Sequence, residues 1–393
     1  MINLPDWSVA RKVLLIRLRS IGDTVLMTPC LAALKALRPD LQIAVVSEAL
    51  AAPLLEDHPL VDHLIVVEKS LAGRARLVRE LRRERYDVAF NLHGGTTATW
   101  LARLAGTKCA IGYKSYRHSP RLDLRAPDAE VILGRKQLHT VEQQLALLHW
   151  AGVPWPLRRP QLSLAVPGGV ESCVREKLNA ACVAQADRVH TTSAQTNRLP
   201  TRPSAQADSL RYTDDIARGH FAVIAPAAAF ESKRWTAAGF AEVAQHLRHH
   251  WQMPSVVVAR PGQDQLASTV AKQAGAVTIA GLTLKELMAL INLSRAFVGN
   301  DSGPMHVAAA LRRPLVAVFG SSNPTVWHPW TDSPYRVVGG QGLGAGGQIE
   351  GAQWPKDTNT PDADGDFAIR RVPASEVIAA VNDVLKLALA ASE

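Results

Sequence analysis

The segment 17–24 has residues suited to acid–base chemistry, because it places a glycine and a carboxylate just after a β-rich apolar run. Ligands of α/β proteins bind at the carboxyl ends of the strands, where this segment is expected to lie. Gly22 permits a sharp turn or a close approach of the backbone to a ligand. Asp23 can take a proton from an attacking hydroxyl, but at the start of a helix it also suits a capping role. The residue types leave both roles open.

The segment 225–235 follows the first predicted strand of the second half of the chain and contains Lys233 and Arg234 ahead of a predicted helix. Such a pair can hold a diphosphate, because the charge that develops on a leaving group needs a fixed cation. The alternative is a solvated charged pair with Trp235 packed at the start of the helix.

The segment 299–306 joins the end of a predicted strand to a helix that has Pro304 in its first turn. The N–H groups of a helix start can bind phosphate without a charged side chain, and Asp301 can bind sugar hydroxyls. Helix capping is the alternative for this segment. The candidate ligand-binding residues here are Asp301, Ser302, Gly303 and His306.

Asp264 follows another predicted strand, in the sequence Pro-Gly-Gln-Asp. It can hydrogen-bond a ribose, and a plain turn explains the same residues equally well. No Gly-x-Gly-x-x-Gly follows an early strand, and no Gly-Lys-Ser/Thr motif occurs. The sequence therefore argues against a dehydrogenase and against a P-loop NTPase.

The segment 70–86 is strongly basic, with six arginines against two glutamates, in a chain of 393 residues with a formal net charge of +9. Such an excess attracts phosphates on nucleic acid, on lipid headgroups or on a sugar. Nucleic acid is not expected, because the segment lacks interleaved aromatic residues and a known binding module. The alternative is that these arginines form the solvated face of a helix and bind no ligand. The candidate acceptor-binding residues are Arg74, Arg79, Arg82 and Arg83.

Composition places the chain among soluble globular proteins, with 47% hydrophobic and 20% charged residues. No apolar run is long enough for a signal peptide or a membrane span, so a cytoplasmic protein is expected. The four cysteines, Cys30, Cys109, Cys173 and Cys182, form no Cys-x-x-Cys pair. We expect them to be buried hydrophobic residues, with neither a disulfide framework nor a metal site.

Strand-like and helix-like segments alternate in both halves of the chain, which predicts parallel sheets in two doubly wound α/β domains that face a cleft. The predicted domains are 1–165 and 220–393, and 166–219 is predicted to be a flexible linker or insertion, most of all over 183–215. The Gly- and Asp-rich segment 339–366 is expected to form a surface loop. Strands are predicted at 12–18, 42–46, 63–67, 88–92, 110–111, 221–225, 255–259, 277–280, 297–298 and 315–319. Helices are predicted at 24–37, 71–85, 98–104, 137–150, 237–250, 263–274, 284–292, 304–311 and 374–390.

Taken together, the three segments resemble glycosyltransferase family 9, the ADP-heptose:lipopolysaccharide heptosyltransferases. Their order and spacing match the family from Lys12 to about Trp330. The residues that carry the similarity are Lys12–Arg17, Ile21-Gly22-Asp23, Thr28-Pro29, Lys233-Arg234-Trp235, Asn300–His306, Ala308–Ala310, Pro314 and Phe319-Gly320.

The resemblance implies a GT-B fold, in which two Rossmann-like domains bind the donor (C-terminal domain) and the acceptor (N-terminal domain). It implies transfer of a heptose or related sugar from an ADP-activated donor to the lipopolysaccharide core on lipid A, with inversion and without a metal or cofactor. Asp23 matches the family's proposed base, and Lys233 matches its cation near the donor phosphates. The donor-binding residues expected on this basis are Asp301, Ser302, Gly303, His306, Arg234, Asp264 and Gly22.

The implied partners are a nucleotide-sugar donor, a phosphorylated lipid-saccharide acceptor and the anionic inner face of the inner membrane, on which the protein is expected to be peripheral. The chain departs from the family pattern at four positions. Ala227 stands where the family often has Gly, and Thr236 replaces a common Pro. At Ala228 and Ala229 some members have hydroxyl side chains. These departures weaken the choice of ADP-heptose as donor. They leave open an epimerase-like enzyme of the same fold and a non-catalytic member that binds nucleotide sugar.

Overall fold

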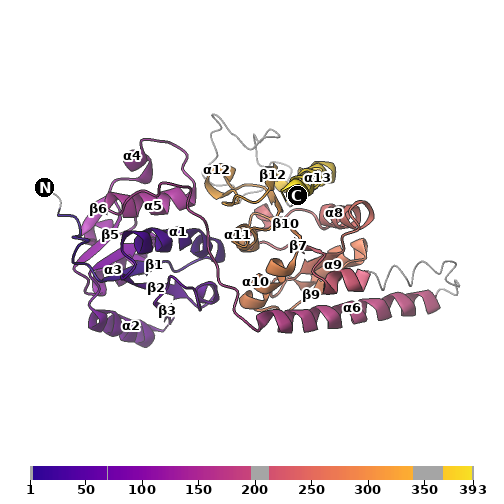
Figure 1. The fold of residues 1–393 in the computed structure, drawn as a ribbon, viewed down its shortest axis with the longest axis horizontal. Coiled ribbons are helices and arrows are strands. Elements are labelled where there is room, and N and C mark those ends of the chain that lie inside the picture. Colours follow the sequence, from indigo (N-terminus) through magenta and orange to yellow (C-terminus); the bar gives the residue numbers. More distant parts are fainter. Residues whose placement is uncertain (1–2, 69, 196–211, 340–365, 392–393) are drawn as a thin grey trace. The chain divides into compact units, whose positions relative to one another are not determined.

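The computed structural model describes residues 3–68, 70–195, 212–339 and 366–391. The chain divides into two compact units (Figure 1). The N-terminal unit consists of Met1–Ala165 together with Thr325–Trp330, and the C-terminal unit consists of Val166–Pro324 and Thr331–Glu393. A short segment from late in the sequence therefore belongs to the N-terminal unit.

The N-terminal unit has a six-stranded parallel sheet with the order β3-β2-β1-β4-β5-β6. From β1 the chain adds β2 and β3 on one side, and it then adds β4, β5 and β6 on the other side. The strand order therefore reverses between β1 and β4, which pair in parallel. The strands are β1 (Lys12–Ile16), β2 (Gln42–Glu48), β3 (His63–Val67), β4 (Val88–Asn91), β5 (Cys109–Tyr113) and β6 (Leu124–Ala126).

Helices cover both faces of this sheet (Figure 1). Helices α1 and α5 pack together, whereas α2 and α3 bury Leu77, Leu81 and Leu101 with the side chains of Leu14 and Ile16. Alternate residues of β1 thus face opposite helical layers, as in a strand buried on both sides. The helices are α1 (Ile21–Leu37), α2 (Leu71–Glu84), α3 (Thr96–Leu104), α4 (Ala129–Leu133) and α5 (Thr140–Trp150), with 3₁₀ turns at Ala52–Leu54 and Ser119–Arg121.

The C-terminal unit has a second six-stranded parallel sheet, with the order β12-β11-β10-β7-β8-β9. In this sheet the strand order reverses between β7 and β10, which also pair in parallel. The strands are β7 (Ala222–Ala225), β8 (Ser255–Val258), β9 (Val277–Ile279), β10 (Ala296–Asn300), β11 (Leu315–Phe319) and β12 (Tyr335–Gly339).

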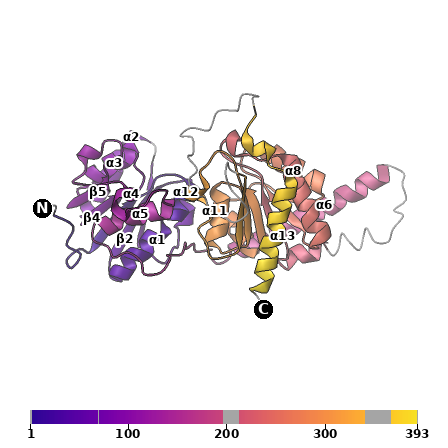
Figure 2. The same cartoon turned by 90° about the horizontal axis from the view of Figure 1, so that it is seen from above.

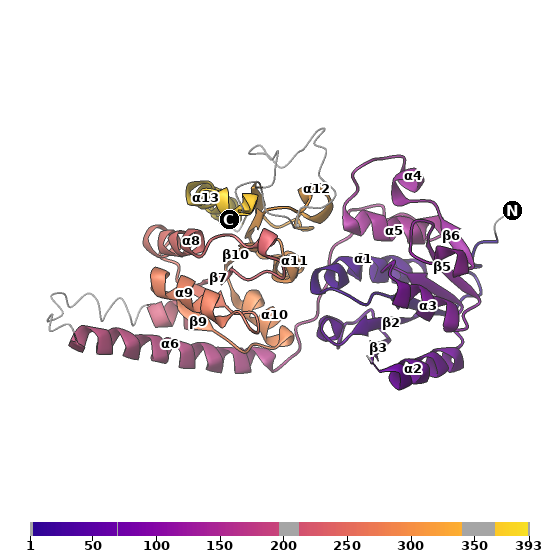
Figure 3. The same cartoon turned by 180° about the vertical axis from the view of Figure 1, so that it is seen from behind.

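On one face of this sheet, α8, α9 and α13 form an apolar core to which they contribute Phe240, Val270 and Val381. Figure 2 shows α13 lying beside α8 across that face. Figure 3 shows α6 running along α10 and β9. The helices are α6 (Val170–Gln195), α8 (Ala237–His250), α9 (Asp264–Ala274), α10 (Leu284–Leu293), α11 (Gly303–Ala310), α12 (Pro324–Trp327) and α13 (Ala374–Ala390), with 3₁₀ turns at Glu231–Lys233 and Ala368–Arg371.

The predicted fold class, two parallel α/β domains of Rossmann-like topology, is confirmed. The structure differs from the prediction over 166–219, because α6 is an ordinary helix up to Gln195 that packs on α10; residues 196–211 lie outside the described residues. The predicted surface loop 339–366 also lies almost wholly outside them.

The prediction of four buried cysteines was wrong in part. Cys30 and Cys182 are buried, Cys109 is half-buried and Cys173 is exposed. Cys173 is on α6, and its Sγ contacts the Glu286 carboxylate at 3.2 Å, so that a polar partner rather than burial accommodates the thiol. All four thiols are free.

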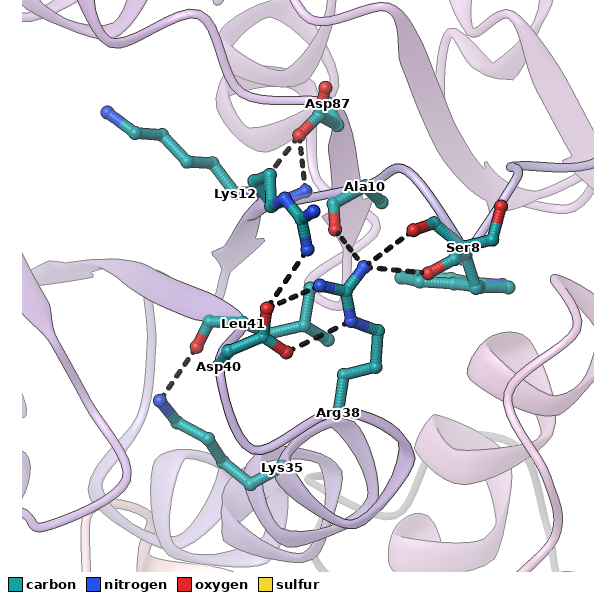
Figure 4. A network of polar contacts seen from close by, with 10 residues as sticks. Ser8, Ala10, Lys12, Lys35, Arg38, Asp40, Leu41 and Asp87 are labelled. Carbon is teal, nitrogen blue, oxygen red and sulfur yellow. Dashed lines mark hydrogen bonds and ion pairs between the residues drawn. The ribbon is translucent and has the colours of Figure 1, made fainter.

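A polar network fixes the amino-terminal edge of the first sheet (Figure 4). Arg38, which ends α1, donates to the carbonyls of Ser8 and Ala10 at 3.0 and 2.9 Å and is paired with Asp40. Asp87, just before β4, accepts from the backbone N–H groups of Arg11 and Lys12 at 2.7 and 3.0 Å. The network holds the starts of β1 and β4 in register and leaves their carboxyl ends to the loops that carry the site.

Candidate active site

Three candidate site residues, one in the N-terminal unit and two in the C-terminal unit, follow strands that flank the point where the strand order of each sheet reverses. In open α/β sheets this topological switch point is where ligands bind, because the loops on its two sides diverge. In the N-terminal unit the flanking strands are β1 and β4, and in the C-terminal unit they are β7 and β10. Asp23 follows β1, Lys233 follows β7 and Asp301 follows β10.

Asp23 lies in the first turn of α1, whose N-cap is Ser20. Its Oδ2 accepts hydrogen bonds from the Ser20 backbone N–H at 3.3 Å and from Ser20 Oγ at 3.0 Å. The side chain keeps 21% of its surface exposed, so a reacting hydroxyl can reach it. The capping interpretation of Asp23 is thus realised in the structure, and it leaves the carboxylate accessible for proton transfer.

Arg17 is a second charged residue at this switch point, and sequence reasoning gave it no role. It follows β1 directly and is 8% exposed. Its guanidinium is paired with Asp23 Oδ1 and donates to the carbonyl of Leu92, at the end of β4. A buried cation requires such partners. Arg17 lies in the segment 17–24 and in the stretch Lys12–Arg17 that carries the family resemblance, but neither feature indicates what its side chain does.

The loop after β4 is built on Asn91, which is fully buried. Its Oδ1 accepts from the N–H groups of His93 and Gly94 at 3.1 and 3.0 Å, and its Nδ2 donates to Thr99 Oγ1 at 3.0 Å. Gly94 has a φ of +76°, and a Cβ there would meet the Tyr116 ring at 2.8 Å. Glycine at this position lets the loop turn against the aromatic ring.

His93 lies within electrostatic reach of both Arg17 and Asp23. Its pKa is lowered, first by burial and then by the positive charge of Arg17, while the negative charge of Asp23 opposes the shift. The imidazole is therefore neutral at neutral pH, and the charge at this edge of the sheet comes from Arg17 and Asp23.

In the C-terminal unit, Lys233 and Asp301 form an ion pair across the switch point. Lys233 Nζ donates to Asp301 Oδ2 at 2.7 Å, and the Asp301 side chain is only 4% exposed while that of Lys233 is 28% exposed. Asp301 thus holds the ammonium in place from the buried side. An ammonium has three N–H donors, so Lys233 retains donors for a second anion.

Asn300, the last residue of β10, links the two loops beside this pair. Its Oδ1 accepts from the Trp235 backbone N–H at 3.0 Å, and its Nδ2 donates to the Pro226 carbonyl at 2.8 Å. The side chain is fully buried. It fixes both ends of the segment that carries Lys233, a role the sequence motif did not reveal because it depends on β7 and β10 being neighbours.

The start of α11 leaves its N–H groups free of side-chain capping. Ser302 is the N-cap, and its hydroxyl donates to the Asn300 carbonyl at 3.1 Å instead of capping the helix. Gly303 opens the helix, and His306 is buried in its first turn. The capping interpretation for Ser302 was wrong, and these amides remain suited to binding a phosphate.

Arg234 and Asp264 lie on loops that share one anchor. The carbonyl of Ala228 accepts from Arg234 Nε at 3.0 Å and from Gln263 Nε2 at 3.3 Å, which ties the loop after β7 to the loop after β8. Asp264 begins α9 and is exposed. Gly22, in contrast, is buried in the first turn of α1 and belongs to the N-terminal unit.

The predicted acceptor-binding arginines lie on α2. Arg74, Arg79 and Arg83 are exposed, and their side chains form no ion pair or hydrogen bond with the described residues. Arg82 has a structural contact, because its Nε donates to the Leu104 carbonyl at 2.8 Å and thereby joins α2 to the end of α3.

Two further observations concern the whole of the described chain. None of its helices combines the length and the apolar character needed to cross a membrane. Within the same residues, no group of three or more His, Cys, Asp or Glu side chains is arranged to hold a metal ion.

Comparison with known proteins gives one consistent family. The family model for glycosyltransferase family 9 (heptosyltransferase) matches residues 74–342, more than half of the chain. The chain is 26% identical over 377 residues to lipopolysaccharide heptosyltransferase 3 of Escherichia coli, with 93% of this chain and 96% of that protein covered.

Solved structures of the same family share the fold. The glycosyl transferase family 9 structure from Veillonella parvula DSM 2008 is similar with a TM-score of 0.74 at 21% identity, over 96% of this chain and 98% of that one. The E. coli ADP-heptose lipopolysaccharide heptosyltransferase II is similar with a TM-score of 0.68 at 24% identity, over 96% and 99%. The fold is GT-B, and the chain belongs to glycosyltransferase family 9, the heptosyltransferases.

Proposed function

We propose that this glycosyltransferase moves a heptose from an ADP-activated donor to the lipopolysaccharide core on lipid A, with inversion at the anomeric carbon and without a metal. The names of the similar E. coli proteins support this donor and acceptor, since one is an ADP-heptose lipopolysaccharide heptosyltransferase and another a lipopolysaccharide heptosyltransferase. The observation that carries the proposal is the placement of charge: an accessible carboxylate at one switch point and a half-buried cation at the other.

Asp23 is the proposed base. As the acceptor hydroxyl attacks the anomeric carbon, its proton passes to the Asp23 carboxylate, and the bond from that carbon to the diphosphate oxygen breaks. One face of the sugar receives the new bond while the other loses the old one, which inverts the configuration. The transfer yields ADP and the heptosylated acceptor.

Lys233 is the proposed cation for the departing diphosphate. Negative charge develops on the diphosphate during transfer, and the fixed ammonium together with the amides at the start of α11 stabilises it. Asp301 holds Lys233 in position through the 2.7 Å ion pair. The other proposed donor-binding residues are Arg234, Asp264, Ser302, Gly303, His306 and Gly22.

The exposed arginines of α2 are the proposed contact with the phosphorylated acceptor and with the anionic inner face of the inner membrane. Arg74, Arg79 and Arg83 present positive charge that no described partner neutralises. Arg82 contributes less on this proposal, because its Nε is bonded to the Leu104 carbonyl. The enzyme is then peripheral on the cytoplasmic side.

The test is transfer from ADP-heptose to a lipid A–core acceptor that lacks the heptose, followed by ADP release and mass spectrometry of the acceptor. Asp23→Asn is expected to lower kcat by about 10²- to 10⁴-fold, with ADP binding unchanged by calorimetry. Glu130→Gln, which removes an exposed carboxylate from α4 of the same unit, serves as the control and is expected to keep full activity.

Three outcomes contradict parts of the proposal. Undiminished transfer by Asp23→Asn removes Asp23 as the base. Donor binding without turnover on any acceptor of a panel indicates a non-catalytic member, and a sugar epimer formed without acceptor indicates an epimerase.

A further inference from the structure

We propose that Arg17 is a positioning residue that fixes the orientation of the Asp23 carboxylate for proton transfer. This inference rests on the proposed role of Asp23 as base. It assigns to a buried arginine a function in the same reaction, through the carboxylate rather than through contact with substrate.

The first argument is the way Arg17 is anchored. Its backbone N–H donates to the Val46 carbonyl at 3.0 Å, which continues the β1–β2 pairing by one residue. Its guanidinium donates to the Leu92 carbonyl, just beyond the end of β4. The side chain therefore spans from β1 to β4 across the switch point, between the two central strands of the sheet.

The second argument is the geometry of the contact with Asp23. Two different nitrogens of Arg17 are used, Nη1 for the Leu92 carbonyl and Nη2 for Asp23 Oδ1. Because the guanidinium is planar and rigid, fixing one nitrogen fixes the other. The position of Asp23 Oδ1 is thus set by the end of β4.

The third argument is that the second carboxylate oxygen is held independently. Asp23 Oδ2 accepts from Ser20 N and Ser20 Oγ at 3.3 and 3.0 Å. With one oxygen tied to Arg17 and the other to Ser20, the plane of the carboxylate is defined. Among the described residues, Oδ1 is contacted by Arg17 alone, so its second lone pair can still accept a proton.

The fourth argument is that two basic residues near Asp23, His93 and Arg19, do not take the place of Arg17. Burial and the charge of Arg17 lower the pKa of His93, so its ring is neutral. Arg19, two residues further on, is 72% exposed in its side chain and is paired with Glu48 at 3.3 Å. Among the described residues, loss of Arg17 therefore leaves the Asp23 carboxylate with its two contacts to Ser20, and general-base catalysis depends steeply on such geometry.

The test is a double-mutant cycle in the transfer assay, with Arg17→Met, Asp23→Asn and the double variant. Arg17→Met is expected to lower kcat by about 10- to 100-fold, with the KM for ADP-heptose and ADP binding unchanged. In the Asp23→Asn background the same substitution is expected to cause no further loss, because the carboxylate it orients is gone. Arg17→Lys keeps the positive charge but lacks the planar guanidinium with its two terminal nitrogens. It is expected to have a kcat between those of Arg17→Met and the wild type.

The matched control is Arg19→Met, which removes an exposed arginine from the same loop and is expected to leave kcat unchanged. Circular dichroism and the melting temperature report whether each variant folds, and if Arg17→Met does not, the cycle is run with Arg17→Lys. Equal losses from the Arg17 substitution in both backgrounds overturn the positioning role, as does full activity of the Arg17 variant. Full activity of Asp23→Asn overturns the proposed base and the positioning role together, whereas a large loss in Asp23→Asn with full activity of the Arg17 variant overturns the positioning role alone.

Discussion

At the residue scale, the candidate site consists of charged pairs whose members come from different strands. Asp23, Lys233 and Asp301 were predicted from motifs, because each follows an apolar strand and precedes a helix. The pairing of Lys233 with Asp301 joins residues 68 positions apart, and it exists only because β7 and β10 are neighbours. Strand order is a tertiary property, so the motifs indicated candidate residues but not the partners that hold them.

Arg17 and Asn300 are two buried residues whose roles the sequence could not predict. Both lie inside segments that the sequence singled out, and both have side chains that are almost fully covered. A sequence pattern cannot separate an arginine at a strand end that faces solvent from one that is buried against a carbonyl. Their roles became visible only through their partners.

His58 gives a prediction on pH. The ring is 2% exposed; its Nδ1 accepts from the Leu60 N–H at 3.2 Å and its Nε2 lies 3.0 Å from Ser163 Oγ. Its pKa is lowered, chiefly by burial and only partly opposed by the Ser163 carbonyl. The unfolded chain therefore binds a proton that the folded chain resists, and the free energy of unfolding should fall as the pH drops below about 6.5.

The measurement is urea unfolding at pH 8 and at pH 5. His58→Gln is expected to be less stable at pH 8 by about 1–2 kcal/mol, since it disturbs a buried hydrogen-bond pair, and to lose less stability than the wild type on going to pH 5. The control His63→Gln changes an exposed side chain on β3. An unaltered pH dependence in His58→Gln would rule out this assignment.

At the element scale, segments with a clear apolar period were predicted with their correct bounds. Strands β3 and β11 and helices α8 and α13 match the predicted ranges residue for residue. Strand β6 was missed because it is only three residues long, and β12 was missed although it contains Val337 and Val338. Helix α6 was missed because its apolar residues follow no helical period. Tertiary packing on α10 decides the state of α6, which local pattern cannot reveal.

Gly320 gives a prediction at this scale, because it lies where β11 meets two 3₁₀ turns. A Cβ on Gly320 would collide with the Ser232 carbonyl and would lie 2.8 Å from Ile369 Cβ. Gly320→Ala must therefore displace the turn that carries Lys233 or the one that carries Ile369. We expect a loss of about 1–3 kcal/mol in the free energy of unfolding, together with weaker ADP binding.

Thermal unfolding and calorimetric titration with ADP check both effects. Gly168→Ala is the control, because a Cβ there meets nothing within 4 Å. Wild-type ADP affinity in a destabilised Gly320→Ala would show that the collision is relieved on the side of Ile369, away from Lys233.

At the scale of the whole molecule, the two units repeat one plan. Each has six parallel strands and one point where the strand order reverses. In each, polar loops follow the carboxyl ends of the strands that flank this point. The sequence predicted two such units from alternation alone. The formal net charge of +9 was also evident from the sequence, but the exposure of individual arginines on α2 depended on which face of that helix packs on the sheet.

The charge on α2 yields a prediction for the acceptor. Arg79→Glu combined with Arg83→Glu reverses two exposed charges of the helix. We expect the KM for an acceptor in anionic vesicles to rise by about 10-fold or more, since each basic residue near such a surface contributes about 1 kcal/mol, while kcat stays constant.

The assay is transfer on vesicles at two ionic strengths, and the difference from wild type should shrink at high salt. A double variant of equal net charge, Lys272→Glu with Lys386→Glu, alters exposed residues of α9 and α13 and serves as the control. An identical rise in KM for both double variants would trace the effect to net charge rather than to α2.

The inclusion of Thr325–Trp330 in the N-terminal unit has a consequence for synthesis of the chain. Trp330 Nε1 donates to the Pro160 carbonyl at 2.7 Å, its ring stacks on His139 and the guanidinium of Arg159 lies 4.1 Å above it. On the ribosome the first 165 residues emerge long before Trp330 does. The N-terminal unit thus acquires its last side chains only after residues 166–324 of the C-terminal unit have been translated.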